Sequence, residues 1–344
     1  MAVDQFDLFC AVREREWPYK PVILAPMAGV TDLPFRRVVR HFGTHMVFSE
    51  MVASQAVIRT VKRTGQMMEM NNDQCTAVQL VGADPKIMAY AAALVCNMGV
   101  RHININFGCP VRKVVNTDAG SAIMKDERRA ASIMEAVVRA VNVPVSVKMR
   151  LGWDDAHMNA KAIAKIAEGS GIAMITVHGR TRQQMFAGKA NWAAIAEIKG
   201  AVSIPVVVNG DITDVTTART ALVESGADGI MIGRGALGSP WILSEIQDAI
   251  NQPNMPNAQT TPHQGITLCS TTATMRIQTA KTHADYMFEF YEPRTAIHIS
   301  RRVVGYYLKW LPNIAHCRRM LSSLNSRDQI NELLDTLLAR IGVQ

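Results

Sequence analysis

The residue with the most evident chemistry is Cys109, in the segment His102-Ile-Asn-Ile-Asn-Phe-Gly-Cys-Pro110. An apolar pattern through Ile103 and Ile105 predicts a β-strand. The Gly-Cys-Pro sequence after it predicts a turn, so the thiol would lie at the carboxyl end of that strand. In parallel α/β proteins, ligands bind at this end of the strands.

Three roles for this thiol are open. A buried cysteine can be inert and serve only packing. It can be a nucleophile, which would need a histidine base; no histidine adjoins Cys109 in the sequence, although His178 could approach it in space. It can also be a general acid or base beside a bound flavin. The other residues expected near Cys109 favour the third role.

Eight short apolar runs, rich in β-branched residues, recur between Pro21 and Gly233, and most intervals between them carry helical patterns such as Pro85–Met98. This alternation predicts a (β/α)8 TIM barrel. The alternative is a doubly wound open sheet, which would normally have a glycine-rich phosphate turn after its first strand. The stretch Ala25-Pro-Met-Ala-Gly29 is not such a turn. The predicted strands are Val22–Pro26, His45–Ser49, Thr76–Val81, His102–Asn106, Val143–Met149, Ile172–His178, Ile204–Asn209 and Gly229–Gly233.

The organisation expected along the chain has four parts. An N-terminal extension covers residues 1–20, and the barrel covers residues 21–250. A stretch rich in Pro, Asn, Gln, Thr and Ser predicts a linker over residues 251–272. Helical periodicity without strand signals then predicts a small all-helical C-terminal domain over residues 273–344.

The C-terminal domain has an uneven charge distribution, because no acidic residue lies between Glu292 and Asp328. Basic residues mixed with aromatic ones suit phosphate contacts and base stacking, so this domain is expected to bind nucleic acid. The alternative is a solvated helix face. The residues concerned are Arg294, Arg301, Arg302, Lys309, Arg318, Arg319 and Arg327, with Tyr306, Tyr307 and Trp310 among them.

The composition of the 344-residue chain, 48% hydrophobic and 19% charged, is typical of a folded soluble protein. Its six cysteines are scattered without a Cys-x-x-Cys pair, which argues against a zinc knuckle, an iron–sulfur cluster or a disulfide framework and favours the cytoplasm. The net charge of +8 favours an anionic partner. No apolar run reaches the roughly 18 residues of a membrane helix, and the first residues do not form a secretory signal.

The carboxyl ends of the predicted strands carry a set of residues that suits flavin mononucleotide (FMN). The phosphate would lie on Asn209–Asp211 and Gly233–Arg234, where glycines expose backbone N–H groups. Lys148 would stabilise the anionic reduced flavin, and Gln79 would bond the edge of its ring. The candidate cofactor-binding residues are Pro26, Met27, Ala28, Gln79, Lys148, His178, Asn209, Gly210, Asp211, Gly233 and Arg234, of which His178 could instead be an ordinary core histidine.

On these residues the chain resembles the tRNA-dihydrouridine synthases, and within them the bacterial B-type branch. The resemblance is strong over residues 21–243 and weaker over the helical tail. The segments that carry it are Ala25-Pro-Met-Ala-Gly-Val-Thr-Asp32, Asn106-Phe-Gly-Cys-Pro110, Val147-Lys-Met-Arg150, His178-Gly-Arg-Thr-Arg182, Val208-Asn-Gly-Asp-Ile212 and Met231-Ile-Gly-Arg-Gly-Ala236.

The resemblance implies an FMN enzyme, reduced by NADPH, that reduces the C5–C6 double bond of uridines in tRNA to dihydrouridine. A hydride would pass from flavin N5 to uracil C6, and Cys109 would protonate C5. We expect a monomer that binds tRNA, without membrane or metal. The candidate substrate-binding residues are Asn106, Arg150, Arg180, Arg301 and Arg302.

The sequence departs from the family pattern in places. Asn104 stands where an Asp is common, and Arg301-Arg-Val-Val-Gly-Tyr-Tyr307 lacks the Arg-Lys-His that usually precedes the aromatic residues. Residues 251–272 also look longer and more polar than usual. Two other functions remain open: an FMN reductase of a small pyrimidine or enone, and a tRNA-binding flavoprotein without reductase activity.

Overall fold

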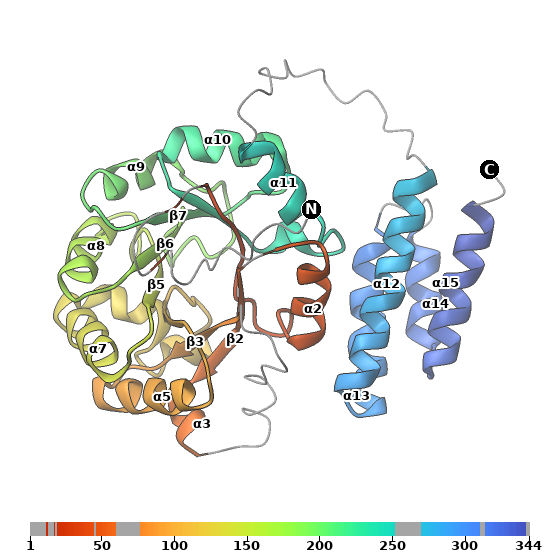
Figure 1. Ribbon diagram of the computed structural model, residues 1–344, viewed down its shortest axis with the longest axis horizontal. Coiled ribbons are helices and arrows are strands. Elements are labelled where there is room, and N and C mark those ends of the chain that lie inside the picture. The colour runs from red at the N-terminus through yellow and green to blue at the C-terminus, as the bar shows by residue number, and fades with distance from the viewer. Residues whose placement is uncertain are drawn as a thin grey trace.

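The computed structural model of the protein describes residues 12, 17, 19–44, 46–59, 76–251, 270–309 and 314–341. Eight parallel strands form a closed barrel in chain order, and β1 completes it by pairing with β8 (Figure 1). The predicted (β/α)8 fold is therefore confirmed, and the open sheet is excluded. The strands are β1 Val22–Leu24, β2 Met46–Ala53, β3 Thr76–Val81, β4 Ile103–Phe107, β5 Val145–Arg150, β6 Met174–His178, β7 Val206–Asn209 and β8 Gly229–Ile232.

Helices surround the barrel, and four of them begin at an aspartate whose side chain accepts a hydrogen bond from a backbone N–H of the first turn. These N-caps are Asp32, Asp84, Asp126 and Asp214. The caps satisfy N–H groups that the helix itself leaves without partners. The surrounding helices are α2 Leu33–His41, α3 Ser54–Ile58, α5 Pro85–Asn97, α6 Arg112–Val115, α7 Glu127–Ala140, α8 Ala160–Gly169, α9 Ala193–Lys199, α10 Val215–Ser225 and α11 Ile242–Asn251, with 3-10 helices η1 Gly120–Lys125 and η2 Arg234–Ala236.

Alternate residues of each strand face the helices or the barrel interior. In β4, for example, Ile103, Ile105 and Phe107 belong to the large core between strands and helices. A separate apolar cluster fills the lower interior of the barrel, and two residues of the N-terminal segment, Val12 and Trp17, pack into it. That segment therefore contributes to the closure of the barrel at the amino ends of its strands.

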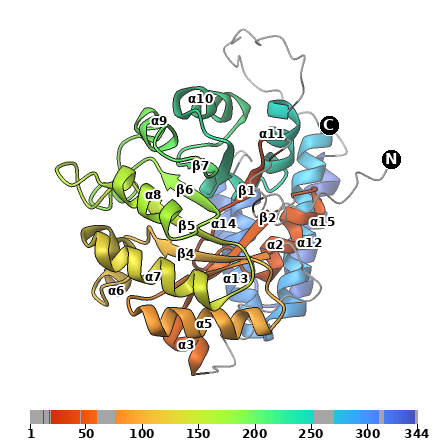
Figure 2. The same ribbon diagram turned by 60° about the vertical axis from the view of Figure 1, so that its left-hand side comes forward.

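Within the described residues, the C-terminal region, called the helical domain below, contains four helices: α12 Ser270–Phe290, α13 Pro293–Tyr307, α14 Ile314–Ser323 and α15 Arg327–Ile341. They lie beside α2 on one side of the barrel (Figures 1 and 2). Their core contains Ile277, Met287, Tyr307 and Leu334, and Trp241 joins it from the end of the barrel sequence. Most of the predicted linker lies outside the described residues. Among the described residues, no helix is long and apolar enough to cross a membrane.

A partly buried polar contact joins the barrel and the helical domain. Tyr291 lies between α12 and α13. Its hydroxyl donates to Oδ2 of Asp32, the N-cap of α2, over 2.9 Å. Burial raises the pKa of Asp32 to about 6, with a smaller contribution from Glu50 in the same direction, while the hydrogen bonds and Arg36 act against it. Asp32 therefore binds its proton more tightly in the folded chain than in the unfolded one.

This linkage predicts the effect of Asp32→Asn on stability. The wild type loses stability as the pH rises from about 4 to about 6, because its folded state must release the Asp32 proton. The variant keeps the hydrogen-bond acceptor without the charge. In urea titrations we therefore compare the free energy of unfolding of the variant with that of wild type at each pH. The difference, variant minus wild type, is expected to be up to about 3 kcal/mol larger at pH 7 than at pH 4.

Asp84→Asn is the matched control, because Asp84 caps α5 in the same way with an exposed carboxylate. A stability difference for Asp32→Asn that is the same at both pH values would contradict the prediction.

Candidate active site

A cavity of about 600 Å³ opens at the carboxyl ends of the strands. All eleven candidate cofactor-binding residues line it: Pro26, Met27, Ala28, Gln79, Lys148, His178, Asn209, Gly210, Asp211, Gly233 and Arg234. Cys109, Asn106 and Arg150 line it as well. The barrel thus brings together residues that are spread over most of its sequence, and the volume is in the range of small-molecule sites.

The turn that carries Cys109 is held by the side chain of Asn106. Oδ1 of Asn106 accepts hydrogen bonds from the backbone N–H groups of Gly108 and Cys109, at 3.0 and 2.8 Å. From the other side, Nε of Arg150 donates to the carbonyl of Gly108 over 2.8 Å. The thiol is therefore fixed by two neighbouring strands, β4 and β5.

Asn106 is itself the upper end of a chain of hydrogen bonds that runs down the barrel interior. Its Nδ2 donates to Oε1 of Gln79 over 2.8 Å, and Nε2 of Gln79 donates to Oδ1 of Asn104 over 2.6 Å. Nδ2 of Asn104 donates to Oγ of Ser146 over 2.8 Å, and Ser146 lies 2.6 Å from Nε2 of His102. All five side chains are buried.

The lower end of this chain is electrically neutral. Burial lowers the pKa of His102 to about 3, so its ring is uncharged and can accept the Ser146 hydroxyl proton. Each amide above His102 then donates its N–H to the group below it and accepts from the group above it. The side-chain carbonyl of Asn106, at the top, therefore faces the backbone of the Cys109 turn. The amide of Asn104 fits this order because it has both a donor and an acceptor, whereas an ionised Asp would only accept.

The thiol of Cys109 is protonated at neutral pH. Its half-buried position raises its pKa, against a backbone hydrogen bond from Val111 and the positive charges of Arg150 and Lys148, which lower it. A neutral thiol can donate a proton, and the same two cations stabilise the thiolate that remains. This environment suits a general acid.

Lys148 is partly exposed in the wall of the cavity, and its ammonium group donates a hydrogen bond to the neutral Oδ1 of Asn209 over 2.8 Å. Burial, reinforced by Arg150, lowers its pKa to about 7. A group so poorly compensated is well placed to bind a ligand that carries or develops negative charge. His178 also lines the cavity, and burial together with the surrounding cations lowers its pKa, so it is neutral.

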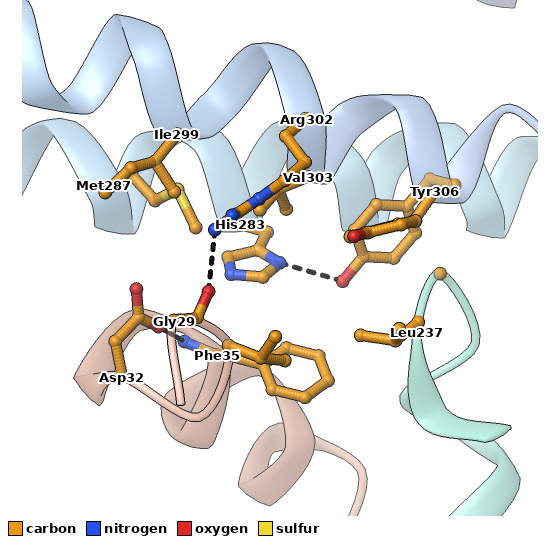
Figure 3. Close-up of a pocket in the computed structure, with 13 residues that line it drawn as sticks. Gly29, Asp32, Phe35, Leu237, His283, Met287, Ile299, Arg302, Val303 and Tyr306 are labelled. Atoms are coloured by element: carbon orange, nitrogen blue, oxygen red, sulfur yellow. Dashed lines mark hydrogen bonds between the residues drawn. The ribbon is translucent and has the colours of Figure 1, made fainter. Parts of the chain in front are cut away.

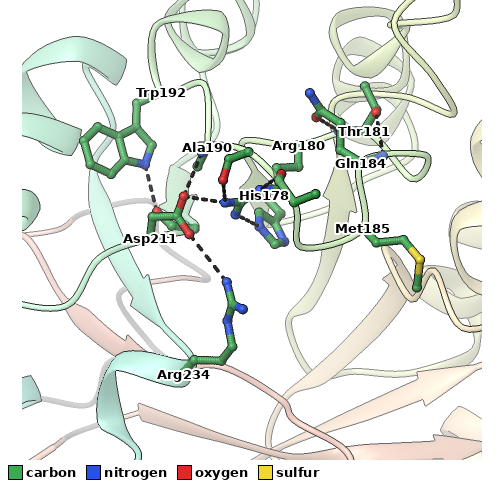
Figure 4. A network of polar contacts seen from close by, with 12 residues as sticks. His178, Arg180, Thr181, Gln184, Met185, Ala190, Trp192, Asp211 and Arg234 are labelled. Atoms are coloured by element: carbon green, nitrogen blue, oxygen red, sulfur yellow. Dashed lines mark hydrogen bonds and ion pairs between the residues drawn. The ribbon is translucent and has the colours of Figure 1, made fainter.

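The carboxylate of Asp211 is occupied by protein groups. Arg180 donates to its Oδ2 over 2.5 Å, the Ala190 N–H donates over 2.8 Å, and Arg234 lies 3.5 Å from Oδ1 (Figure 4). What the loop offers a ligand is its backbone: Gly210 has a φ of +116°, and a Cβ there would lie 2.8 Å from the His178 ring. These features are those of a loop shaped to receive an anion.

Three of the five candidate substrate-binding residues lie outside the cavity. Arg180 is buried behind it, where it also donates to the carbonyls of Ala187 and Gly188. Arg301 donates to the carbonyl of Leu324 within the helical domain. Arg302 donates to the carbonyl of Gly29 in the loop after β1.

Phe186 is a cavity residue that the sequence analysis did not identify. Its ring lies at the rim, 51% exposed, with the guanidinium groups of Arg150 and Arg234 at 5.7 and 5.0 Å from its centroid. The loop that carries it is held because Arg150 donates to the carbonyls of Thr181 and Met185. No periodic pattern marks this residue; the only signal is an aromatic residue in a loop after a predicted strand.

Comparison with known proteins identifies the family. Residues 23–341 match the family described as dihydrouridine synthase (Dus). The chain belongs to the dihydrouridine synthase family. It is 44% identical over 313 residues to a protein of Rickettsia conorii named "Probable tRNA-dihydrouridine synthase", covering 90% of this chain and 91% of that one. It is 40% identical over 309 residues to the tRNA-dihydrouridine synthase B of Pseudomonas aeruginosa, covering 89% of each chain.

The resemblance stated from the sequence motifs is thereby confirmed, including the similarity to the B-type proteins. Among solved structures, a 2-naphthoyl-CoA reductase shares the fold, with a TM-score of 0.51 and 11% identity over 67% of this chain and 51% of that chain. In the described part of this dihydrouridine synthase, no group of three or more His, Cys, Asp or Glu residues could hold a metal ion.

The buried amide chain predicts a large cost for Asn104→Leu. The substitution removes the acceptor of the Gln79 N–H and the donor to the Ser146 hydroxyl in the buried interior of the barrel. We expect the free energy of unfolding, measured by urea denaturation, to fall by about 2–4 kcal/mol.

Asn325→Leu serves as the control, because the exposed Asn325 amide also makes hydrogen bonds, to Ser323 and Arg301. It is expected to cost less than about 1 kcal/mol. Equal costs for the two variants would show that the buried chain contributes nothing special to stability.

Proposed function

We propose that this protein is an FMN-dependent enzyme that uses NADPH to reduce the C5–C6 double bond of specific uridines in tRNA, giving 5,6-dihydrouridine. The observation that carries the proposal is a protonated thiol, Cys109, held at the rim of a cavity that is also lined by the amino group of Lys148. Membership of the dihydrouridine synthase family supports it.

The cavity residues fit FMN. Backbone N–H groups of the loops around Gly210 and Gly233, with the guanidinium of Arg234, would hold the phosphate. Lys148 would face the pyrimidine part of the ring, where the reduced flavin carries negative charge. Gln79 uses one N–H and one lone pair in the buried chain, which leaves one of each for the ring edge.

When bound, FMN would supply the hydride that goes from its N5 to uracil C6, after reduction by NADPH. The protein supplies the proton. Cys109 donates it to C5 of the uracil, and the C5–C6 double bond becomes a single bond. Asn106 and Arg150 hold the backbone of the Cys109 turn so that the thiol keeps one position. Lys148 and Arg150 stabilise the thiolate until it is protonated again.

The target uridine has to leave its stack to reach the cavity, at a cost of a few kcal/mol. The exposed ring of Phe186 offers a face on which a base can stack, and the positive charge of Arg150 and Arg234 beside it attracts the phosphates. Further phosphate contacts from the helical domain would offset the cost. We further propose a monomer that acts in the cytoplasm without a metal ion.

The decisive variant is Cys109→Ala. We expect wild type to form dihydrouridine in unmodified tRNA with NADPH, detected by nucleoside mass spectrometry, and the variant to form it at least about 100-fold more slowly, because the general acid is lost. Its affinity for FMN, measured by titration of the apoprotein, should stay within about twofold of wild type, since a thiol-to-methyl change removes no predicted flavin contact.

Loss of FMN from the variant would instead make Cys109 a structural residue. If neither protein formed dihydrouridine while both bound reducible FMN, a small-molecule reductase would replace the present proposal.

A further inference from the structure

The backbone of Gly29 lies between the two domains, and both its N–H and its carbonyl make hydrogen bonds. Its N–H donates to Oε1 of Glu50, a buried residue of β2. Its carbonyl accepts from Nη2 of Arg302, in α13 of the helical domain, over 2.6 Å (Figure 3). Gly29 has a φ of +73°, a conformation that favours glycine, so the sequence itself fixes the turn that presents this peptide.

The same loop forms one wall of the flavin cavity. Pro26, Met27 and Ala28, directly before Gly29, line that cavity. Within the loop, Oγ1 of Thr31 accepts from the Met27 N–H over 2.9 Å, so the loop is braced across its base. A displacement of Gly29 is therefore transmitted to residues that face the cofactor.

A second contact from the helical domain lies at the end of the loop, where the Tyr291 hydroxyl reaches the N-cap Asp32. Between the two contacts is a narrow crevice lined by residues of both domains (Figure 3). Val30 and Leu237 line this crevice and also the flavin cavity. The crevice between the domains and the flavin cavity thus share two wall residues.

We propose that Arg302 and Tyr291 are positioning residues of the flavin site: the docked helical domain holds the loop between β1 and α2 in its binding conformation. The inference rests on the proposed function in that it takes FMN as the ligand of the cavity. It gives Arg302 a role different from the RNA contact expected from its charge. By linkage, a ligand that moves the helical domain changes the affinity for FMN, and FMN changes the affinity for that ligand by the same factor.

The test compares three variants of the full chain. Arg302→Met removes the donor to Gly29, and Tyr291→Phe removes the donor to Asp32. Arg294→Met is the matched control, because Arg294 is an exposed arginine of the same helix. Circular dichroism first verifies that each variant keeps its helix content.

The first readout is the FMN dissociation constant, from the quenching of flavin fluorescence as apoprotein is added. We expect Arg302→Met and Tyr291→Phe each to weaken binding about 3- to 10-fold, the range for loss of a partly exposed hydrogen bond. Arg294→Met should stay within about twofold. FMN affinities equal to wild type in both Arg302→Met and Tyr291→Phe would overturn the proposal.

The second readout needs no flavin. Amide hydrogen exchange of the peptide spanning residues 25–31 in the apoprotein should be faster in Arg302→Met than in wild type or Arg294→Met. Faster exchange with unchanged FMN affinity would overturn the coupling, and unchanged exchange would overturn the positioning role. If the wild type bound no FMN at all, the proposed function would fail, whereas the exchange data would still decide whether Arg302 holds the loop.

Discussion

The constraint on which the structure depends most is that every polar side chain inside the closed barrel needs a hydrogen-bond partner. A barrel of parallel strands normally fills its interior with apolar layers. Here the amides of Gln79, Asn104 and Asn106 enter that interior. Their burial would be costly without hydrogen bonds, and each amide bonds to the next. The position of the Cys109 turn is set by Asn106, the last member of this series, so it depends on the buried amides of Gln79 and Asn104 below it.

The distribution of charge follows the same division of the barrel. The lower interior combines an apolar cluster with the neutral end of the amide chain, and the cavity above it collects Lys148, Arg150 and Arg234. Among the described residues that line the cavity, the only acid is Asp211, whose carboxylate is bound by Arg180 and by the Ala190 N–H. The cavity therefore presents positive charge and backbone N–H groups, which explains why its natural ligands should be anionic.

The sequence was sufficient to predict the barrel, because buried parallel strands are continuous apolar runs and their carboxyl ends share one face. The same rule placed Gln79, Lys148 and Asn209 in one cavity. It could not assign the arginines. Charge can be counted in a sequence, but the partner of a long side chain is set by tertiary packing.

Arg180 and Arg302 illustrate this limit. Arg180 donates to Asp211 and to the carbonyl of Gly188, and Arg302 donates to the carbonyl of Gly29. The same limit applies to Phe186. Its loop is held at the rim by hydrogen bonds from Arg150, the last residue of β5, and no local sequence pattern encodes these contacts. The chain of buried amides could not be predicted from the sequence either, because its members face one another only after β3, β4 and β5 have paired.

The packing of Trp17 has a consequence for the order in which the protein folds. Its ring lies against Gly229, at the start of the last strand, where a side chain would collide with it. Residues from the two ends of the barrel sequence must therefore meet before the interior is sealed. On the ribosome, Trp17 emerges well before β8, so barrel closure is a late, long-range event that leaves apolar surface exposed until this strand arrives.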